Sequence, residues 1–563
     1  MDAPLRPGLT RSPPASVALR AAARAGPLLL YALPLALALT LALAQATDAA
    51  GWQALAADPQ TPRALALSVF TASASTALSL AACVFLVTHL HGGPLWRRLT
   101  RALAPMLAVP HAAFAIGLAL LVMPAGLLAR LLALATGWNS PPDWPTVNDP
   151  NGIGLVLVLV GKETPFLLWH CVALLQRPEL AQTLKGWQAS AATLGYGRAA
   201  TWWRVLWPLL LPRLGWPLLA VLAYGLGVVD LALIVGPASP PTLALVAWND
   251  LVAGDAARNA QGAAAALLLA AVLVALAVAA VGLHVWARRT WIDHAVNGRR
   301  GSAVRGTAAG SHVAAAMLGI AIALYLGVGA LLFGSSFTGV WSFPALLPQR
   351  WTAAAWLQVA DSAPLLLASA GLAAGVTCAC ALLVLCWLEA TPSNWDARVL
   401  PWVLAPLVVP PLLWIAGLYT LALRLRLDGT WAGLAWAHGL ATLPYVFVAL
   451  QPAWRSFDRR YVTTALALGR TPAAALLQVK LPMLVAPIAA ALAVGFAVSV
   501  AQYLPTQFIG AGRLATVTTE AVTLAAGGQR HTAAAFALLQ ALLPLGGFAL
   551  AAWIGRRPWE PHR

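Results

Sequence analysis

Charged residues are scarce in this chain. They occupy 9% of its 563 positions, whereas a soluble globular protein carries about 25%. Hydrophobic residues make up 60% of the chain, and the mean hydropathy is +0.77. Too little polar surface exists to cover this composition in water, and long apolar runs recur along the whole length. The sequence therefore predicts an all-α polytopic membrane protein.

Cysteine is also scarce, and the common sequence motifs of catalytic, phosphate-binding and metal-binding sites are missing. The sequence contains no GxxxxGK[ST] phosphate loop, no hydrolase triad and no His/Cys metal spacing. We therefore expect no catalytic residue, no metal site, no cofactor and no ATP binding through that loop. The five cysteines lie in or beside apolar runs, where we interpret them as small packing residues: Cys83, Cys171, Cys378, Cys380 and Cys386.

The net charge of +17 could suggest a nucleic-acid partner. The Lys and Arg residues, however, fall in short loops between the apolar runs, as expected when basic loops stay on the inner side of a membrane. The expected partner is therefore the lipid bilayer and not nucleic acid.

Twelve apolar runs are long enough to be membrane spans, six in each half of the chain. Residues 1–287 and 313–563 form the two predicted domains, and residues 288–312, rich in Arg, Gly and Ser, form a predicted cytoplasmic linker. An even number of spans returns the chain to its starting side, so the halves are predicted to be parallel repeats. The predicted spans are about 26–46, 63–90, 103–129, 152–175, 206–236, 262–287, 313–334, 362–388, 398–424, 430–452, 482–510 and 533–555.

The distribution of basic residues predicts that both termini lie inside. The first run ends in Ala44-Gln45-Ala46, which is similar to a signal-peptidase site, but cleavage would leave an odd number of spans, so we expect an uncleaved anchor. Two loops do not follow the charge rule. One is predicted inside but holds Glu389, Asp396 and Arg398, and the other is predicted outside but holds Arg424 and Arg426.

Two predicted cytoplasmic loops share one pattern, 274 positions apart. In each, small residues precede a Leu-Gly pair, and a Pro thirteen positions after the Gly opens an apolar run. Small residues allow close approach of another protein, and Gly permits a tight turn. One such loop could be an ordinary interfacial helix, but two matching copies suit two copies of a partner. They are Ala189–Pro212, with Leu194, Gly195 and Pro208, and Thr463–Pro487, with Leu468, Gly469 and Pro482.

Other parts of the two halves also match. Residues 242–254 and 516–528 are again 274 positions apart, whereas Val109-Pro110 and Val409-Pro410 are 300 apart. The first half therefore holds about 26 extra residues before its loop. We expect residues 138–152, WNSPPDWPTVNDPNG, to account for most of them as an external loop.

The two loops resemble the cytoplasmic loop of permease subunits of binding-protein-dependent ABC importers. In that family the loop reads Glu-Ala-Ala, three residues, Gly and later Pro. Aligned on Gly, this chain has Ala189-Ser190-Ala191 and Thr463-Thr464-Ala465 at those positions, so both copies lack the Glu and any salt bridge that it makes. Nearly the whole chain is covered, because each half is similar to one permease subunit of the type I fold.

The resemblance implies a mechanical role. Each loop would place a coupling helix, about 189–200 and 463–474, in a cleft of a cytoplasmic ATPase dimer, so that ATP-driven closure swings the halves between inward and outward states. The implied partners are two ATPase copies and a periplasmic solute-binding protein, at a bacterial inner membrane. Fused permeases of this kind serve ferric-iron and thiamine importers, and residues 229–248 and 499–528 most resemble a branch labelled as thiamine permeases.

Ionisable and polar residues within the spans are candidates for the translocation path. Asp230 lies in the fifth span, and Lys162 and Glu163 are neighbours in the fourth, so they should face different directions. Lys162 and Glu163 could instead mark a helix break at Pro165, and Asp230 could instead pair with a buried backbone or hydroxyl group in the bundle. The second half offers neutral groups that could face Asp230: Gln502, Tyr503 and Gln507.

Two further interpretations stay open. Trp202 and Trp203 in the first loop could be interfacial anchors or could pack against an ATPase. A twelve-span secondary transporter also has two parallel six-span halves, but it would not need duplicated docking loops. A membrane enzyme or sensor would need a catalytic cluster or a soluble domain, which the sequence lacks.

Overall fold

The computed structural model describes residues 14–295 and 305–556, and the regular elements of this part of the chain are all helices, with no strand. Ten helices are long and apolar enough to cross a membrane, and two further helix pairs raise the number to twelve if each bent pair is one span. The prediction of an all-α polytopic membrane protein is confirmed.

The helices before residue 296 occur in this order. They are α1 (Pro14–Pro27), η1 (Leu28–Ala32), α2 (Leu33–Ala46), α3 (Ala49–Ala57), α4 (Thr61–Leu90), α5 (Trp96–Ala108), α6 (His111–Val122), α7 (Leu127–Thr136), α8 (Ile153–Leu175), α9 (Pro178–Thr193), α10 (Arg198–Thr201), η2 (Trp202–Leu206), α11 (Trp207–Leu210), η3 (Leu211–Leu214), α12 (Gly215–Gly227), α13 (Asp230–Val235), α14 (Leu243–Leu251) and α15 (Ala256–Ala295).

The helices after residue 304 follow a similar order. They are α16 (Arg305–Ser335), α17 (Ala354–Asp361), α18 (Ala363–Ala390), η4 (Ser393–Trp395), α19 (Asp396–Val408), α20 (Pro411–Leu425), α21 (Trp431–Arg455), α22 (Arg460–Ala467), α23 (Pro472–Ala475), η5 (Leu476–Lys480), α24 (Leu481–Met483), α25 (Val485–Val500), α26 (Leu504–Gly510), α27 (Val517–Ala526) and α28 (Arg530–Gly555). The expected linker overlaps the end of α15 and the start of α16, and its residues 296–304 lie outside the described chain.

Four predicted spans are broken where the sequence suggested continuous helices. The runs 103–129 and 398–424 break at Pro110 and Pro410, and the second forms two helices bent by 97°. Proline lacks an N–H and pushes the preceding residue out of the helical region, which explains both breaks. The runs 206–236 and 482–510 also break, so that the short helices α13 and α26 follow α12 and α25.

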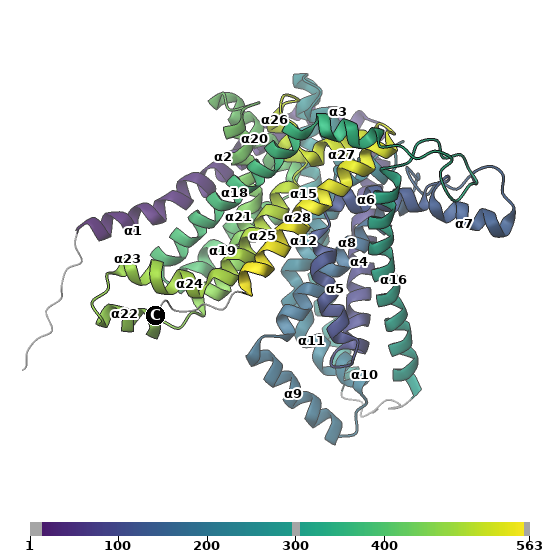
Figure 1. Ribbon diagram of the computed structural model, residues 1–563. Coiled ribbons are helices and arrows are strands. Elements are labelled where there is room, and N and C mark those ends of the chain that lie inside the picture. The colour runs from purple at the N-terminus through teal and green to yellow at the C-terminus, as the bar shows by residue number, and fades with distance from the viewer. Residues whose placement is uncertain (1–13, 296–304, 557–563) are drawn as a thin grey trace, which may run out of the picture.

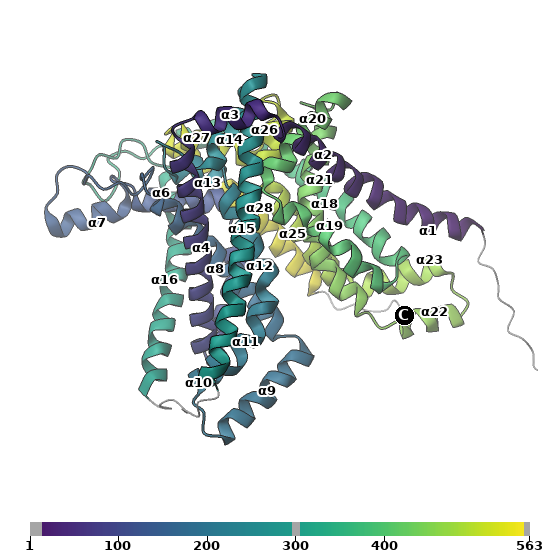
Figure 2. The ribbon, with the colours of Figure 1, turned by 180° about the vertical axis from the view of Figure 1, so that it is seen from behind.

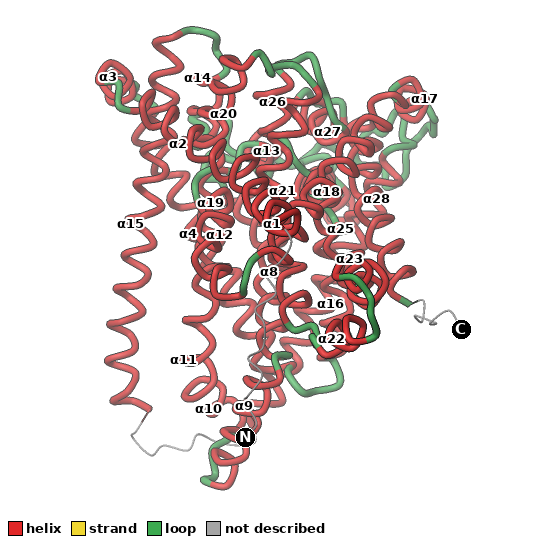
Figure 3. Tube along the Cα trace, turned by 90° about the vertical axis from the view of Figure 1, so that its left-hand side faces the viewer, coloured by secondary structure: helices red, strands yellow, loops and turns green. Residues whose placement is uncertain are grey.

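Segments gather at two ends of the molecule. We call the end that carries α9, α10, α22 and α23 the loop face, and the end that carries α3, α14, α17 and α27 the opposite face (Figures 1 and 3). The helices leading to α9 and those leading to α22 lie close together near the opposite face and diverge toward the loop face (Figures 1 and 2).

The first span of each half packs against the other half. Helices α1 and α2 contact α18 and α20, and α16 contacts α4 and α6. The hydroxyl of Tyr31 donates to the carbonyl of Val403 at 2.8 Å, and that of Tyr325 donates to the carbonyl of Gly161 at 2.9 Å. The first span of each half therefore packs against the other half, and the two exchanged spans hold the halves together.

Two glycines permit this close packing. A Cβ on Gly117 of α6 would lie 2.5 Å from the Cγ1 of Val328 on α16, and a Cβ on Gly417 of α20 would meet the carbonyl of Ala38 on α2. These glycines are 300 positions apart, like the Val-Pro pairs that precede them. Helices α16 and α2 thus each pack closely against the backbone at an equivalent glycine of the other half.

Further details recur between the halves. The N–H of Leu243, which begins α14, donates to the Ser68 hydroxyl at 2.9 Å, and the N–H of Val517, which begins α27, donates to the Ser369 hydroxyl at 2.9 Å. The segment between α7 and α8 is non-helical, as expected for the additional residues 138–152.

Candidate functional site

The first loop turns at the end of α9. This helix ends at Thr193, and Gly195 takes a left-handed conformation with φ of 78°. The N–H of Tyr196 donates to the carbonyl of Ala191 at 2.9 Å, and that of Gly195 donates to Ala192 at 3.0 Å. These two bonds form a Schellman motif, which satisfies the last carbonyls of the helix.

The second loop repeats this turn at the end of α22. Gly469 has φ of 82°, and its N–H donates to the carbonyl of Leu466 at 3.0 Å. The N–H of Arg470 donates to Ala465 at 3.0 Å. Each donor and acceptor lies 274 positions after its counterpart, so the recurrence extends to individual backbone bonds.

The chain after each turn also repeats. A helix of four residues, α10 or α23, leads into a five-residue π-helical segment, η2 or η5, and then into a short α-helix that contains Pro208 or Pro482 at its second position. Each proline follows its π-helical segment without a break in the helix, and its missing N–H removes one backbone hydrogen bond, which is consistent with the wider turn just before it. The predicted coupling helices at 189–200 and 463–474 are therefore wrong in their bounds, because the turns at Gly195 and Gly469 interrupt both.

The tip of each loop exposes a leucine. Leu194 is 60% exposed and Leu468 is 78% exposed. The predicted residues around them divide in the same way in both loops: Ala191 and Ala465 are buried, whereas Ala189, Ser190, Thr463 and Thr464 are exposed. Sequence reasoning noted the Leu-Gly pairs but did not assign the leucines a role.

The first loop also has a hollow beside its tip. A cavity of about 300 Å³ lies between α9 and the segment after the turn, lined among others by Trp187, Leu194 and Tyr196. Trp202 is buried, so it packs within the chain and does not face a partner, whereas Trp203 is exposed.

Aromatic side chains anchor the first loop to α4. The indole N–H of Trp207 donates to the hydroxyl of Thr88 at 2.8 Å, and Trp202 packs edge-on against His91 with ring centroids 5.3 Å apart. Arg198 donates to the carbonyl of His91. Burial lowers the pKa of His91, and the charge of Arg198 lowers it further, so this imidazole is neutral and packs as an aromatic ring.

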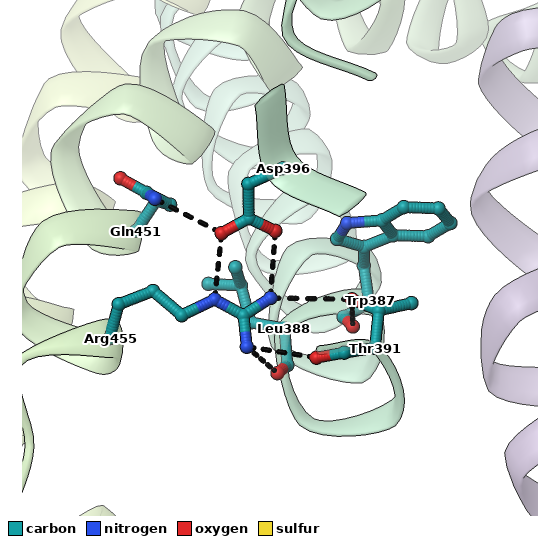
Figure 4. Close-up of polar contacts among 6 residues, drawn as sticks. All are labelled: Trp387, Leu388, Thr391, Asp396, Gln451 and Arg455. Atoms are coloured by element: carbon teal, nitrogen blue, oxygen red, sulfur yellow. Dashed lines mark hydrogen bonds and ion pairs between the residues drawn. The ribbon is translucent and has the colours of Figure 1, made fainter. Parts of the chain in front are cut away.

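Charged side chains anchor the second loop (Figure 4). Arg455 at the end of α21 forms two parallel bonds of 2.7 Å to Asp396 at the start of α19, and Gln451 donates to the same carboxylate. Arg455 also donates to the carbonyls of Leu388 and Thr391. A planar guanidinium suits such bidentate pairing, and the pair is largely buried.

A second ion pair lies beside it. Lys480 at the end of η5 donates to Glu389 at 2.6 Å and lies 3.9 Å above the ring of Trp454. The acidic loop that did not fit the charge rule is thus explained, because Asp396 and Glu389 are the partners of Arg455 and Lys480.

The neighbours Lys162 and Glu163 point in different directions, as predicted. Lys162 is buried and donates to the carbonyls of Met106 and Val109, at 2.9 and 2.6 Å. Those carbonyls lie at the break between α5 and α6, so Lys162 stabilises that break. Glu163 is buried and lies 3.3 Å from Nε2 of His111.

Asp230 belongs to the same polar region but not to a continuous fifth span. It begins α13, directly after the break, and interacts electrostatically with His111, Tyr224 and Tyr503. Tyr224 also interacts with Glu163. We call His111, Glu163, Tyr224, Asp230 and Tyr503 the central cluster.

The two predicted glutamines flank the central cluster on the second half. Gln502 and Gln507 lie just before and within α26, and both are partly buried. The structure thus brings Tyr503 to Asp230, while the glutamines lie beside it. His111 and the tyrosines were not predicted, because an isolated His or Tyr in an apolar run carries no pattern.

The described residues contain no group of three or more His, Cys, Asp or Glu side chains that could hold a metal ion. The central cluster offers carboxylates, phenols and one imidazole for polar contacts with a solute, and the flanking Gln502 and Gln507 add amides.

Comparison with known proteins identifies a relative over nearly the full length. No family model matches the chain, and no solved structure matches it significantly. The chain is 36% identical over 532 residues to the inner membrane ABC transporter permease protein YnjC of Escherichia coli (strain K12), which covers 93% of this chain and 95% of that protein. The chain therefore belongs to the inner membrane permeases of ABC transporters.

Proposed function

We propose that this permease is the fused, two-half permease of an importer. Residues 1–287 and 313–563 would be parallel repeats joined by the linker, with both termini and the loop face in the cytoplasm. The loop face would bind two copies of a cytoplasmic ATPase, one at each loop.

The duplicated turn is the observation that carries this proposal. Two unlike sequences form the same Schellman motif at Gly195 and Gly469 and expose a leucine at the same place, Leu194 and Leu468. An exposed leucine at a rigid helix end is suited to fill an apolar pocket of a partner. Two such tips suit a dimer of identical subunits.

The arrangement of the helices supports a mechanical role. The two loops sit at diverging ends of the molecule, while the halves meet near the opposite face and are tied by their swapped first spans (Figure 2). Closure of an ATPase dimer would bring the loop-bearing ends together, and the change would reach the central cluster through α8, α12, α21 and α25.

The central cluster is our candidate for the translocation path. Asp230 and Glu163 come from the first half, and Tyr503, Gln502 and Gln507 come from the second, so relative motion of the halves would change their spacing. A solute would be delivered from the periplasm by a separate solute-binding protein. On family resemblance, that solute is thiamine, ferric iron or another small solute.

A twelve-span secondary transporter was the alternative, and membership of the ABC permeases now favours the importer. The test is purification of the tagged permease after its expression together with a candidate ABC ATPase of the same organism. A native mass equal to one permease and two ATPases is expected. A permease that retains no ATPase, under conditions where a related permease retains its own, would contradict the proposal.

A further inference from the structure

A small cavity on the opposite face concentrates positive charge. It has a volume of about 100 Å³ and lies where α6, α7, α16 and α28 meet. Arg130, Arg530 and His531 line it, and within the described chain its wall contains no Asp or Glu. Neither arginine belongs to any ion pair between described residues. We call this site the rim cavity.

Arg130 is held rigidly in the wall. Its side chain is 3% exposed and donates to four backbone carbonyls, those of Ala125, Trp341, Ser342 and Ala345, at 2.6 to 3.0 Å. Its guanidinium also lies 4.3 Å from the ring centroid of Trp341. Carbonyls satisfy hydrogen bonds but carry no net charge, so the positive charge of Arg130 is fixed in place without a counter-charge.

Hydrogen-bond donors surround the same space. Ser335, also in the wall, is 3% exposed, and its hydroxyl has no partner among the described residues. Nδ1 of His531 lies within hydrogen-bonding distance of the Thr338 hydroxyl and of the Ser335 carbonyl. Helix α28 begins at Arg530, so the positive end of its dipole lies here. Fixed cations, a spare hydroxyl and a helix start together match an oxyanion.

The surface beside the rim cavity is apolar. Along α16, large apolar side chains are exposed on the side of the helix that is turned away from the buried Ser335, because the two residues between Phe333 and Ser335 correspond to about 200° of rotation. On α7, which carries Arg130, leucines are exposed as well. In a polytopic protein such side chains face lipid tails. The exposed apolar residues of α16 are Val313, Ile320, Leu326 and Phe333, and the α7 leucines are Leu128, Leu131, Leu132 and Leu134.

We propose that the rim cavity binds the phosphate of an anionic phospholipid, with the acyl chains against the exposed leucines of α7. The cationic wall selects the phosphate, and the apolar surface of α7 distinguishes a lipid from soluble phosphate. The bound lipid would join α7, α16 and α28, which come from both halves of the chain. This inference depends on the membrane fold and not on the transport function.

The test is a binding titration of the delipidated, full-length protein in detergent, read by native mass spectrometry. Phosphatidylglycerol is the probe, and diacylglycerol with the same chains is the phosphate-free comparison. We expect one tight phosphatidylglycerol site, at least tenfold weaker in Arg530→Gln and a few-fold weaker in Ser335→Ala. Arg63→Gln is the matched control, since Arg63 is an exposed arginine in the first turn of α4, and it should bind like the wild type.

Three outcomes would overturn the proposal. The first is equal phosphatidylglycerol affinity in the wild type and Arg530→Gln. The second is equally tight binding of diacylglycerol. The third is full displacement of the lipid by millimolar inorganic phosphate, which would assign the cavity to a soluble oxyanion.

Discussion

The two loops have the same backbone and different anchors. The first is held to α4 by Trp207, Trp202 and a neutral His91, whereas the second is held by the ion pairs of Arg455 and Lys480. The bonds around Gly195 and Gly469 nevertheless agree to within 0.1 Å. The glycine and the end of the preceding helix therefore determine the turn. The side chains that anchor each loop can be aromatic or charged without changing it.

This difference has an energetic consequence. Aromatic packing and a neutral hydrogen bond respond little to salt, whereas the partly exposed ion pair of Lys480 and Glu389 is screened, and the largely buried pair of Arg455 and Asp396 is screened less. We expect substitution of the charged anchor residues to destabilise the second loop more than the first. Substitution of the aromatic anchor residues should destabilise the first loop more than the second.

The largest effect is expected from Arg455→Leu. It leaves Asp396 buried without its cation, which costs about 3–5 kcal/mol of unfolding free energy. Thermal unfolding in detergent would measure the loss. The double variant Asp396→Leu/Arg455→Leu should recover much of it, and a single variant as stable as the wild type would show that this pair does not anchor the loop.

Valine at either loop glycine should come next. A left-handed residue other than Gly costs about 1–2 kcal/mol, and a β-branched residue is the worst choice. Gly195→Val and Gly469→Val should each abolish uptake while the protein stays in the membrane. Gly512→Val is the matched control, since Gly512 has φ of 71° but lies between α26 and α27. Normal uptake by Gly469→Val at normal abundance would argue against coupling through this turn.

Trp207→Phe should have a smaller effect, confined to the first loop. It removes the indole N–H that Thr88 accepts, which is worth about 0.5–1.5 kcal/mol. Trp402→Phe, at an exposed tryptophan, should stay near the wild-type unfolding temperature. An equal decrease in the unfolding temperature of both variants would show that the bond between Trp207 and Thr88 does not anchor the first loop.

Lys480→Gln should have the smallest effect. The pair with Glu389 is partly exposed, so its loss should cost about 0.2–1 kcal/mol. Unfolding in low and high salt should show a wild-type stability that falls with salt and a variant that is flatter. Equal salt dependence would mean that this pair contributes nothing to the second loop.

The sequence predicted what depends on local patterns. Apolar runs indicated the spans, and the Leu-Gly and Pro spacing located both turns, because helix ends and left-handed glycines are encoded within a few residues. The pairing of Arg455 with Asp396 was missed, because the partners are 59 positions apart and neither belongs to a motif. The swapped packing of α2 and α16 was missed for the same reason, since an apolar span does not encode which neighbour it contacts.

The most direct test of the account is site-specific photo-crosslinking at the two loop tips. A photoreactive residue at Ser190 and one at its counterpart Thr464, both exposed, would be compared with one at the exposed Gln60 before α4, on the opposite face. The account predicts that both loop positions cross-link to the same ATPase chain and that Gln60 does not. Cross-linking from one loop alone, or from neither while ATPase is bound, would contradict the claim that the two turns are equivalent docking sites.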